Sequence, residues 1–109
     1  MSAPQAIDQP TALEDLVQYQ AGAVVSHTLV KDRSGTVTVF AFDAGEGLSE
    51  HTAPFDALLH VIEGCAAVAV GGVSHAVSAG QIIRLPAGVP HAVHAERRFK
   101  MLLIMIRSA

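Results

Sequence analysis

The stretch that decides the fold is Gly80-Gln-Ile-Ile-Arg-Leu-Pro86-Ala-Gly88-Val-Pro-His91. It places a glycine, a proline, a second glycine and a histidine with five, one and two residues between them. Gly80 suits a hairpin turn, and Pro86 with Gly88 reverses the chain sharply. His91 then begins a new strand, and we expect its side chain to face the interior of a β-structure.

Short β-branched runs separated by turn residues lie on both sides of this stretch. Gly71-Gly72 is the plainest hairpin sequence among the turns. The eight candidate strands cover residues 23–30, 36–42, 57–62, 66–70, 73–77, 81–85, 91–95 and 99–106. No amphipathic helix of about 10–15 residues interrupts the series, which argues against a parallel sheet with crossover helices. The pattern predicts an all-β fold, and eight strands suit a small closed barrel.

The composition limits the partners of the chain. It has 109 residues, of which 50% are hydrophobic and 16% are charged, and its formal net charge is -3. Nucleic acid is not expected as a partner, because its phosphates attract clustered Lys and Arg. The small basic cluster of Arg97, Arg98 and Lys100 is predicted to be the solvated start of a strand. No apolar run approaches the roughly 20 residues of a membrane span, so no membrane partner is expected.

The N-terminal part differs from the rest of the chain. Residues 1–20 are predicted to form a lead segment or arm, and residues 21–109 to form one barrel domain. The lead segment lacks the basic and apolar regions of a signal peptide, and the single Cys65 cannot form an internal disulfide. We therefore predict a cytoplasmic protein. Residues 11–17 are compatible with one helical turn capped by Thr11 and equally with an early strand.

Two parts of the sequence resemble the motifs of small single-domain bacterial cupins. The first part contains His51 after a glycine-containing turn, and then the run His60-Val-Ile-Glu-Gly64. The second part is the stretch 80–91. The resemblance covers about residues 23–106 and implies a double-stranded β-helix, or jelly-roll, barrel. It names no substrate, because cupins include dioxygenases, isomerases, storage proteins and sensor domains.

The resemblance also implies a set of metal ligands. In metal-binding cupins the first motif supplies two histidines and a glutamate, and the second motif supplies one more histidine. His51 and His91 match the first and last of these ligands. The other two positions hold Ala53 and Ala57, and Ala95 replaces an asparagine that often follows the last histidine. The resemblance thus implies a partly degenerate pocket for a divalent transition metal, which would be zinc, nickel, manganese or iron.

His60 is the best substitute for a missing ligand. It lies three residues beyond Ala57, which puts it on the opposite face of a regular strand. His60 therefore reaches the pocket only if a β-bulge lies between the two residues. Asp56 and Glu50 are nearby carboxylates that would serve as a ligand or general base if their loop folds inward. Metal binding through imidazoles is expected to weaken below about pH 6.5, because protonated imidazole cannot coordinate an ion.

The remaining histidines and the cysteine carry weaker expectations. His94 follows His91 by three residues and is predicted to lie on the other face of the strand, in a structural role. His75 is predicted to be exposed beside a tight turn, and His27 is compatible with either face. Cys65 is expected to be a small strand residue rather than a nucleophile.

Residues 99–106 are apolar on both faces of the predicted strand, which is typical of a sheet covered by a second subunit. We therefore expect a homodimer. Three functions fit this sequence. The first is a metal-dependent cupin with oxygenase-like or isomerase-like chemistry. The second is a metal-free module that binds or senses a small molecule in an apolar pocket near Ala53 and Ala57. The third is a dimeric scaffold whose pocket is vestigial. The direction of His60 discriminates between these functions, because the first function loses its third ligand if His60 points outward.

Overall fold

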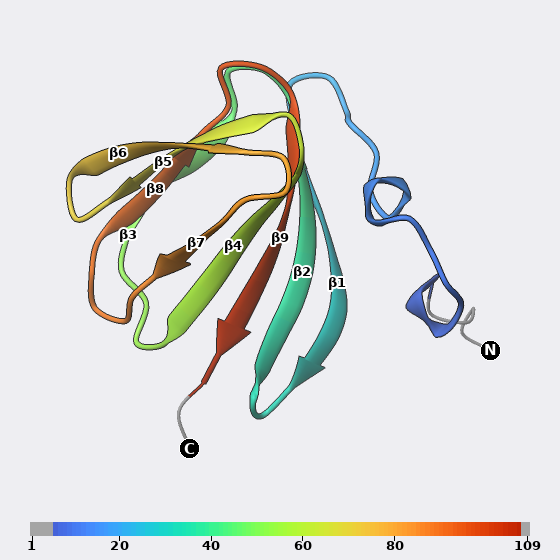
Figure 1. Ribbon diagram of the computed structural model, residues 1–109, viewed down its shortest axis with the longest axis horizontal. Helices are drawn as coiled ribbons and strands as arrows, with labels where there is room; N and C mark the ends of the chain where they lie inside the picture. The colour runs from blue at the N-terminus through green and yellow to red at the C-terminus, as the bar shows by residue number, and fades with distance from the viewer. Residues whose placement is uncertain (1–5, 108–109) are drawn as a thin grey trace.

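Residues 6–107 fold into nine antiparallel strands in two facing sheets (Figure 1). The computed structural model describes residues 6–107, so the first five residues of the lead segment lie outside the described part. The strands are β1 (Val24–Asp32), β2 (Gly35–Phe42), β3 (Gly47–His51), β4 (Asp56–Glu63), β5 (Cys65–Val70), β6 (Val73–Ser78), β7 (Ile82–Leu85), β8 (His91–His94) and β9 (Phe99–Ile106). The predicted all-β fold is confirmed.

The two sheets are built by a chain that repeatedly crosses between them. One sheet has five strands in the order β1-β2-β9-β4-β7, and the other has four in the order β3-β8-β5-β6. The last strand, β9, pairs with β2 and β4 at the centre of the larger sheet. Strands distant in sequence therefore lie side by side, as a jelly-roll barrel requires.

One strand was missing from the sequence prediction. Each of the eight predicted runs is a strand, but β3 is a ninth and it carries His51. Its sequence from Gly47 contains one apolar residue, Leu48, so it lacks the alternation that marks a half-buried strand. It forms because its backbone pairs with β8, with a register shift between Leu48 and His51.

The hydrophobic core lies between the two sheets. Phe42 and Phe99 stack at its centre with ring centroids 4.5 Å apart and an interplanar angle of 8°. Leu59, Val61 and Met101 are fully buried around them. Each such side chain contributes roughly 1.5–3 kcal/mol when it is removed from water. This packing holds the larger sheet against the strands that carry His51 and His91.

The predicted Gly71-Gly72 hairpin is confirmed. The two glycines have φ values of 58° and 80°, and Val70 pairs with Val73 across the turn. Positive φ at both central residues gives a turn whose twist matches the flanking strands. The turn therefore fixes the register of β5 and β6.

The lead segment is attached to the barrel from about residue 13 onward. Its second 3-10 helix, Leu13–Asp15, confirms the helical alternative, but the residue that precedes the helix is Ala12 and not Thr11. Val17 is buried with Val39 and Ala41 on the outer face of the five-stranded sheet. No helix in residues 6–107 is long and apolar enough to cross a membrane.

Lys100 corrects one prediction about the basic cluster. Its side chain is buried rather than solvated, with 5% of its surface exposed. Its Nζ donates a hydrogen bond of 2.6 Å to the carbonyl of Glu14 and lies 4.9 Å from the ring centroid of Tyr19. The lead segment covers this lysine, and sequence spacing could not reveal a partner 86 residues away.

Candidate functional site

His51 and His91 meet where β3 pairs with β8 in the four-stranded sheet, with His91 buried and His51 exposed. They are directly paired across β3 and β8, and their Nε2 atoms lie 3.1 Å apart. The rings stand edge to face, with centroids 4.3 Å apart and an interplanar angle of 69°. The structure therefore brings together the two residues that match cupin ligands.

Each ring is held by a backbone carbonyl on its far side. The Nδ1 of His51 is 2.8 Å from the carbonyl oxygen of Ser49, and the Nδ1 of His91 is 3.2 Å from that of Val89. A carbonyl only accepts hydrogen bonds, so each Nδ1 carries a proton. In the neutral rings the two Nε2 lone pairs then face each other. Two facing lone pairs repel each other, and a proton or a metal ion bound between or beside the two nitrogens removes this repulsion.

Burial keeps His91 neutral. Only 7% of its surface is exposed. Burial lowers the pKa of His91 below its ordinary value, proximity to His51 lowers it further, and the Val89 carbonyl opposes both effects. His51 lies closer to solvent. The pair therefore combines one shielded imidazole that keeps its lone pair at neutral pH with one that incoming ions can reach.

The spacing of the two nitrogens fits a shared metal ion. Imidazole nitrogens bind zinc at about 2.0–2.1 Å, so two neighbouring ligands on one ion lie roughly 3.0–3.4 Å apart. The observed separation of 3.1 Å falls within that range. The Nδ1 to carbonyl contacts are also the outer contacts that orient metal-bound histidines. The separation of these two nitrogens therefore suits a shared divalent ion.

His60 does not lie with the pair. Ala57, Leu59 and Val61 of β4 are buried in the core, and His60 points to the opposite face. The pairing of β4 with β7 is regular from Ala57 to His60. The register shift of β4 lies beyond this point, between Val61 and Glu63 in its pairing with β9. The bulge that would turn His60 inward is therefore absent at the required place, and the expected third ligand is not brought to the site.

The nearby carboxylates do not join the histidines. Oδ1 of Asp56 accepts a hydrogen bond of 2.8 Å from the backbone N–H of Ala87, so it braces the turn before β8. Glu50 is exposed on β3. Within residues 6–107, no group of three or more His, Cys, Asp or Glu side chains is arranged to hold a metal ion. The site therefore consists of two imidazoles.

The other histidines and the cysteine lie away from this pair. His94 is exposed at the end of β8, and His75 is exposed on β6, as predicted for His75. His27 is exposed on β1. Cys65 is exposed at the start of β5.

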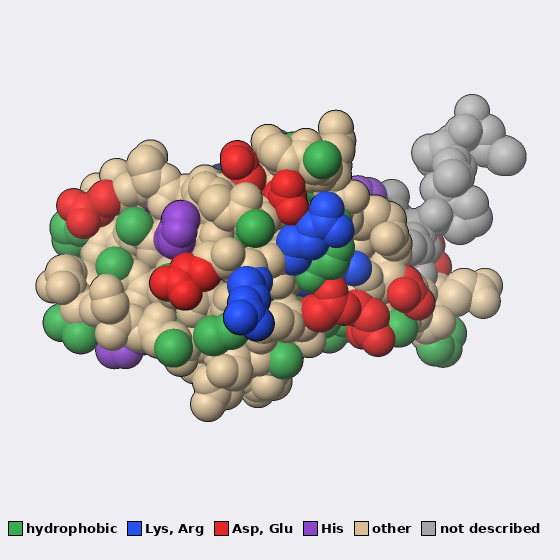
Figure 2. All heavy atoms as spheres, turned by 90° about the horizontal axis from the view of Figure 1, so that it is seen from above, with side chains coloured by type: hydrophobic (Ala, Val, Ile, Leu, Met, Phe, Trp, Pro, Cys, Tyr) green, Lys and Arg blue, Asp and Glu red, His purple; other side chains and the backbone are tan. Residues whose placement is uncertain are grey.

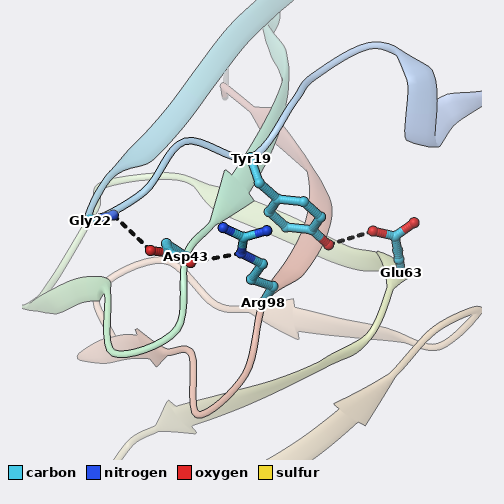
Figure 3. Close-up of polar contacts among 5 residues, drawn as sticks. All are labelled: Tyr19, Gly22, Asp43, Glu63 and Arg98. Carbon is cyan, nitrogen blue, oxygen red and sulfur yellow. Dashed lines mark hydrogen bonds and ion pairs between the residues drawn. The ribbon is translucent and has the colours of Figure 1, made fainter.

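A polar network at one end of the barrel escaped sequence reasoning (Figure 3). The Tyr19 hydroxyl donates to the carboxylate of Glu63, and burial together with Glu63 raises the pKa of Tyr19. Asp43 accepts hydrogen bonds of 2.8 Å from Nε of Arg98 and 2.6 Å from the backbone N–H of Gly22. The Tyr19 contact ties the lead segment to the barrel. The two residues of each contact are far apart in sequence, so no local sequence pattern predicts these contacts.

Comparison with known proteins agrees with this geometry. The cupin domain family model matches residues 38–107. A conserved protein of unknown function from Streptococcus pyogenes has 32% identity and a TM-score of 0.89, over 93% of this chain and 89% of that one. A cupin 2 conserved barrel domain protein from Leptotrichia buccalis has 42% identity and a TM-score of 0.84, over 86% of this chain and 46% of that one.

A curated relative is an uncharacterized protein of Streptomyces coelicolor. It is 34% identical over 65 residues, which make up 60% of this chain and 62% of the relative. The match therefore spans less than two-thirds of the relative's length.

Proposed function

The chain belongs to the cupin domain family, and from that premise we propose that it binds one divalent transition metal ion through His51 and His91. The observation that carries the proposal is the pair of Nε2 atoms 3.1 Å apart, each on a ring whose Nδ1 faces a carbonyl. Two ligands leave most coordination positions of the ion open. Water and the oxygen donors of a small molecule would occupy them.

The chemistry of the proposed site follows from its two ligands. A bound divalent ion would act as a Lewis acid toward an oxygen of the small molecule. Neutral imidazole suits zinc, nickel and iron, and affinity at a nitrogen site rises from manganese and iron to nickel. We therefore expect nickel and zinc to bind more tightly than iron or manganese. His91 holds its ring in the buried part of the site, and His51 faces the side from which ions and ligands arrive.

A metal-free binding module is the second candidate function. It is favoured by one observation, namely that only two ligating side chains meet among the described residues. In that case one proton would be shared between the two Nε2 atoms, and the pair would present a positive charge to a small molecule. The two candidates differ in what bridges His51 and His91.

Elemental analysis of untagged protein purified without chelator tests the proposal. We expect about one equivalent of a transition metal per chain in the wild type. We expect this metal to be lost in His51→Ala and in His91→Ala. His60→Ala is the matched control, because it removes an imidazole on the outer face. No metal in any sample, with no rise in melting temperature on adding nickel or zinc, would favour the metal-free module.

We further propose that the chain forms a homodimer through the outer face of the five-stranded sheet. Val30, Ile82 and Ile106 expose 42%, 56% and 52% of their surfaces there. Asp32 lies on β1 at one edge of this sheet, and Arg84 lies on β7 at the other. A two-fold arrangement that lays β1 over β7 of the second copy brings these opposite charges together. An exposed apolar face with complementary edges fits a second copy of the same chain.

A further inference from the structure

A cavity of about 730 Å³ lies on the outer side of the four-stranded sheet. Its floor includes Ala67 of β5 and Ala76 of β6, which pair directly across the two strands. Their neighbours Val68 and Val77 are buried in the core, so the alanines face away from the barrel interior. Small side chains at paired positions leave a shallow apolar floor. The volume is in the range of small-molecule sites.

The wall of this cavity is mostly basic. It includes Arg97, Arg98 and His75, against one acid, Glu96. Nε of Arg98 is already paired with Asp43 at 2.8 Å. The Arg97 side chain has no hydrogen bond or ion pair within residues 6–107. Figure 2 shows charged side chains of both signs lying side by side at the end of the molecule seen from above. Arg97 is the wall cation whose charge is left for a ligand.

The loop that carries Arg97 is anchored on both sides. Before it, the backbone N–H of Ala95 donates to the carbonyl of Glu46 at 2.8 Å, and the N–H of Gly45 donates to the carbonyl of Ala95 at 2.7 Å. After it, Arg98 is held by Asp43. A short segment fixed at both ends keeps Arg97 at the rim of the cavity. Little ordering of the backbone is then needed when a ligand binds.

We propose that this cavity binds a small organic carboxylate. The guanidinium of Arg97 pairs with the carboxylate, since Arg presents a planar fork that matches carboxylate geometry. The apolar body of the ligand lies on the floor formed by Ala67 and Ala76. This site lies on the opposite face of the sheet from the buried His91, so it does not depend on the proposed metal.

Cys65 offers a direct test because it lines the cavity and is the single cysteine of the sequence. Iodoacetate and iodoacetamide alkylate the same thiol, and they differ in that only iodoacetate carries a carboxylate. The measured quantity is the rate with iodoacetate divided by the rate with iodoacetamide. We expect this ratio to be about two- to fivefold higher in folded protein than in urea-unfolded protein, as one exposed ion pair would produce.

Arg97→Gln should return the ratio to the unfolded value. Arg33→Gln removes the same charge from the β1–β2 turn and should leave the ratio high. Glu96→Gln should raise it further, because it removes the one acid from the wall. Benzoate at millimolar concentration should slow alkylation by iodoacetamide in the wild type but not in Arg97→Gln, and neutral benzamide should do neither.

Circular dichroism of each variant verifies that it is folded. An equal ratio in folded and unfolded protein, or an unchanged ratio in Arg97→Gln, would overturn the proposal. His51→Ala should leave the ratio unchanged, so a failure of the metal site is distinguishable from a failure here.

Discussion

The Nε2 atoms of His51 and His91 lie 3.1 Å apart although the two residues are 40 positions apart in the chain. The carbonyls of Ser49 and Val89 hold the far side of each ring. Both carbonyls belong to the residue two positions before the histidine they contact, so the backbone just before each histidine orients its ring. The pairing of β3 with β8 then sets the distance between the rings. The arrangement of the two histidines is thus built from backbone geometry.

Gly64 should tolerate no side chain. Its φ is 79°, and a Cβ there would lie 2.7 Å from the carbonyl oxygen of Arg98. Gly64→Ala is therefore expected to lower the free energy of unfolding by about 2–3 kcal/mol, from backbone strain and a backbone clash. Urea denaturation measures the change.

Gly72→Ala is the control for this substitution. Gly72 has a similar φ of 80°, but a Cβ there meets nothing within 4 Å. We expect it to cost about 1 kcal/mol, the backbone strain alone. Equal losses in the two variants would show that the clash with Arg98 contributes nothing.

Asp43 should make stability depend on acid pH. The hydrogen bond from Arg98, with smaller contributions from backbone N–H groups, lowers the pKa of Asp43 to about 2. The unfolded state therefore binds the proton first as pH falls. This contribution to stability is fully present above the ordinary aspartate pKa, near 4, and is lost as pH falls from there to about 2.

Asp43→Asn removes that carboxylate. We expect the variant to be less stable than the wild type at pH 6 and the difference to shrink between pH 4 and pH 2, in thermal melts at low ionic strength. Asp8→Asn, in the first 3-10 helix, is a control of the same charge change. A difference that stays constant over this pH range would contradict the role of the Asp43 and Arg98 pair.

The homodimer proposal predicts an oligomer that depends on one sheet face. Ile82→Lys combined with Ile106→Lys places charges on the outer face of the five-stranded sheet and should convert a dimer into a monomer in light scattering after size exclusion. Val73→Lys is the control, because Val73 is 58% exposed but lies on β6 of the other sheet. A wild-type monomer at micromolar concentration, or a dimer that survives both lysines, would refute the proposal.

The part of the fold that the sequence predicted follows from local patterns. Turn residues and β-branched runs are local, and so is the spacing from Gly80 to His91 that sets up the turn before β8. The sequence pattern did not predict β3, because this strand has one apolar residue and forms through backbone pairing with β8. The burial of Lys100 was not predicted, because its partners come from the lead segment.

The candidate site could be predicted only in part. His51 and His91 were identified from the resemblance, and their meeting depends on a pairing of strands that no local pattern encodes. The direction of His60 depended on whether a bulge lay between Ala57 and His60. The strand is regular there, and alternation therefore decides the face.

Calorimetric titration of chelator-treated protein with nickel tests the central claim most directly. We predict one ion per chain for the wild type and unchanged binding in His60→Ala. We predict a loss of affinity of at least tenfold in His51→Ala and in His91→Ala, because even the partners that orient a ligand contribute about 10–100-fold. Affinity should fall as the pH is lowered from 7.5 to 5.5, because protons compete for the imidazoles. Binding that persists in both His51→Ala and His91→Ala, or no binding by the wild type, would contradict the claim that these two histidines share a metal ion.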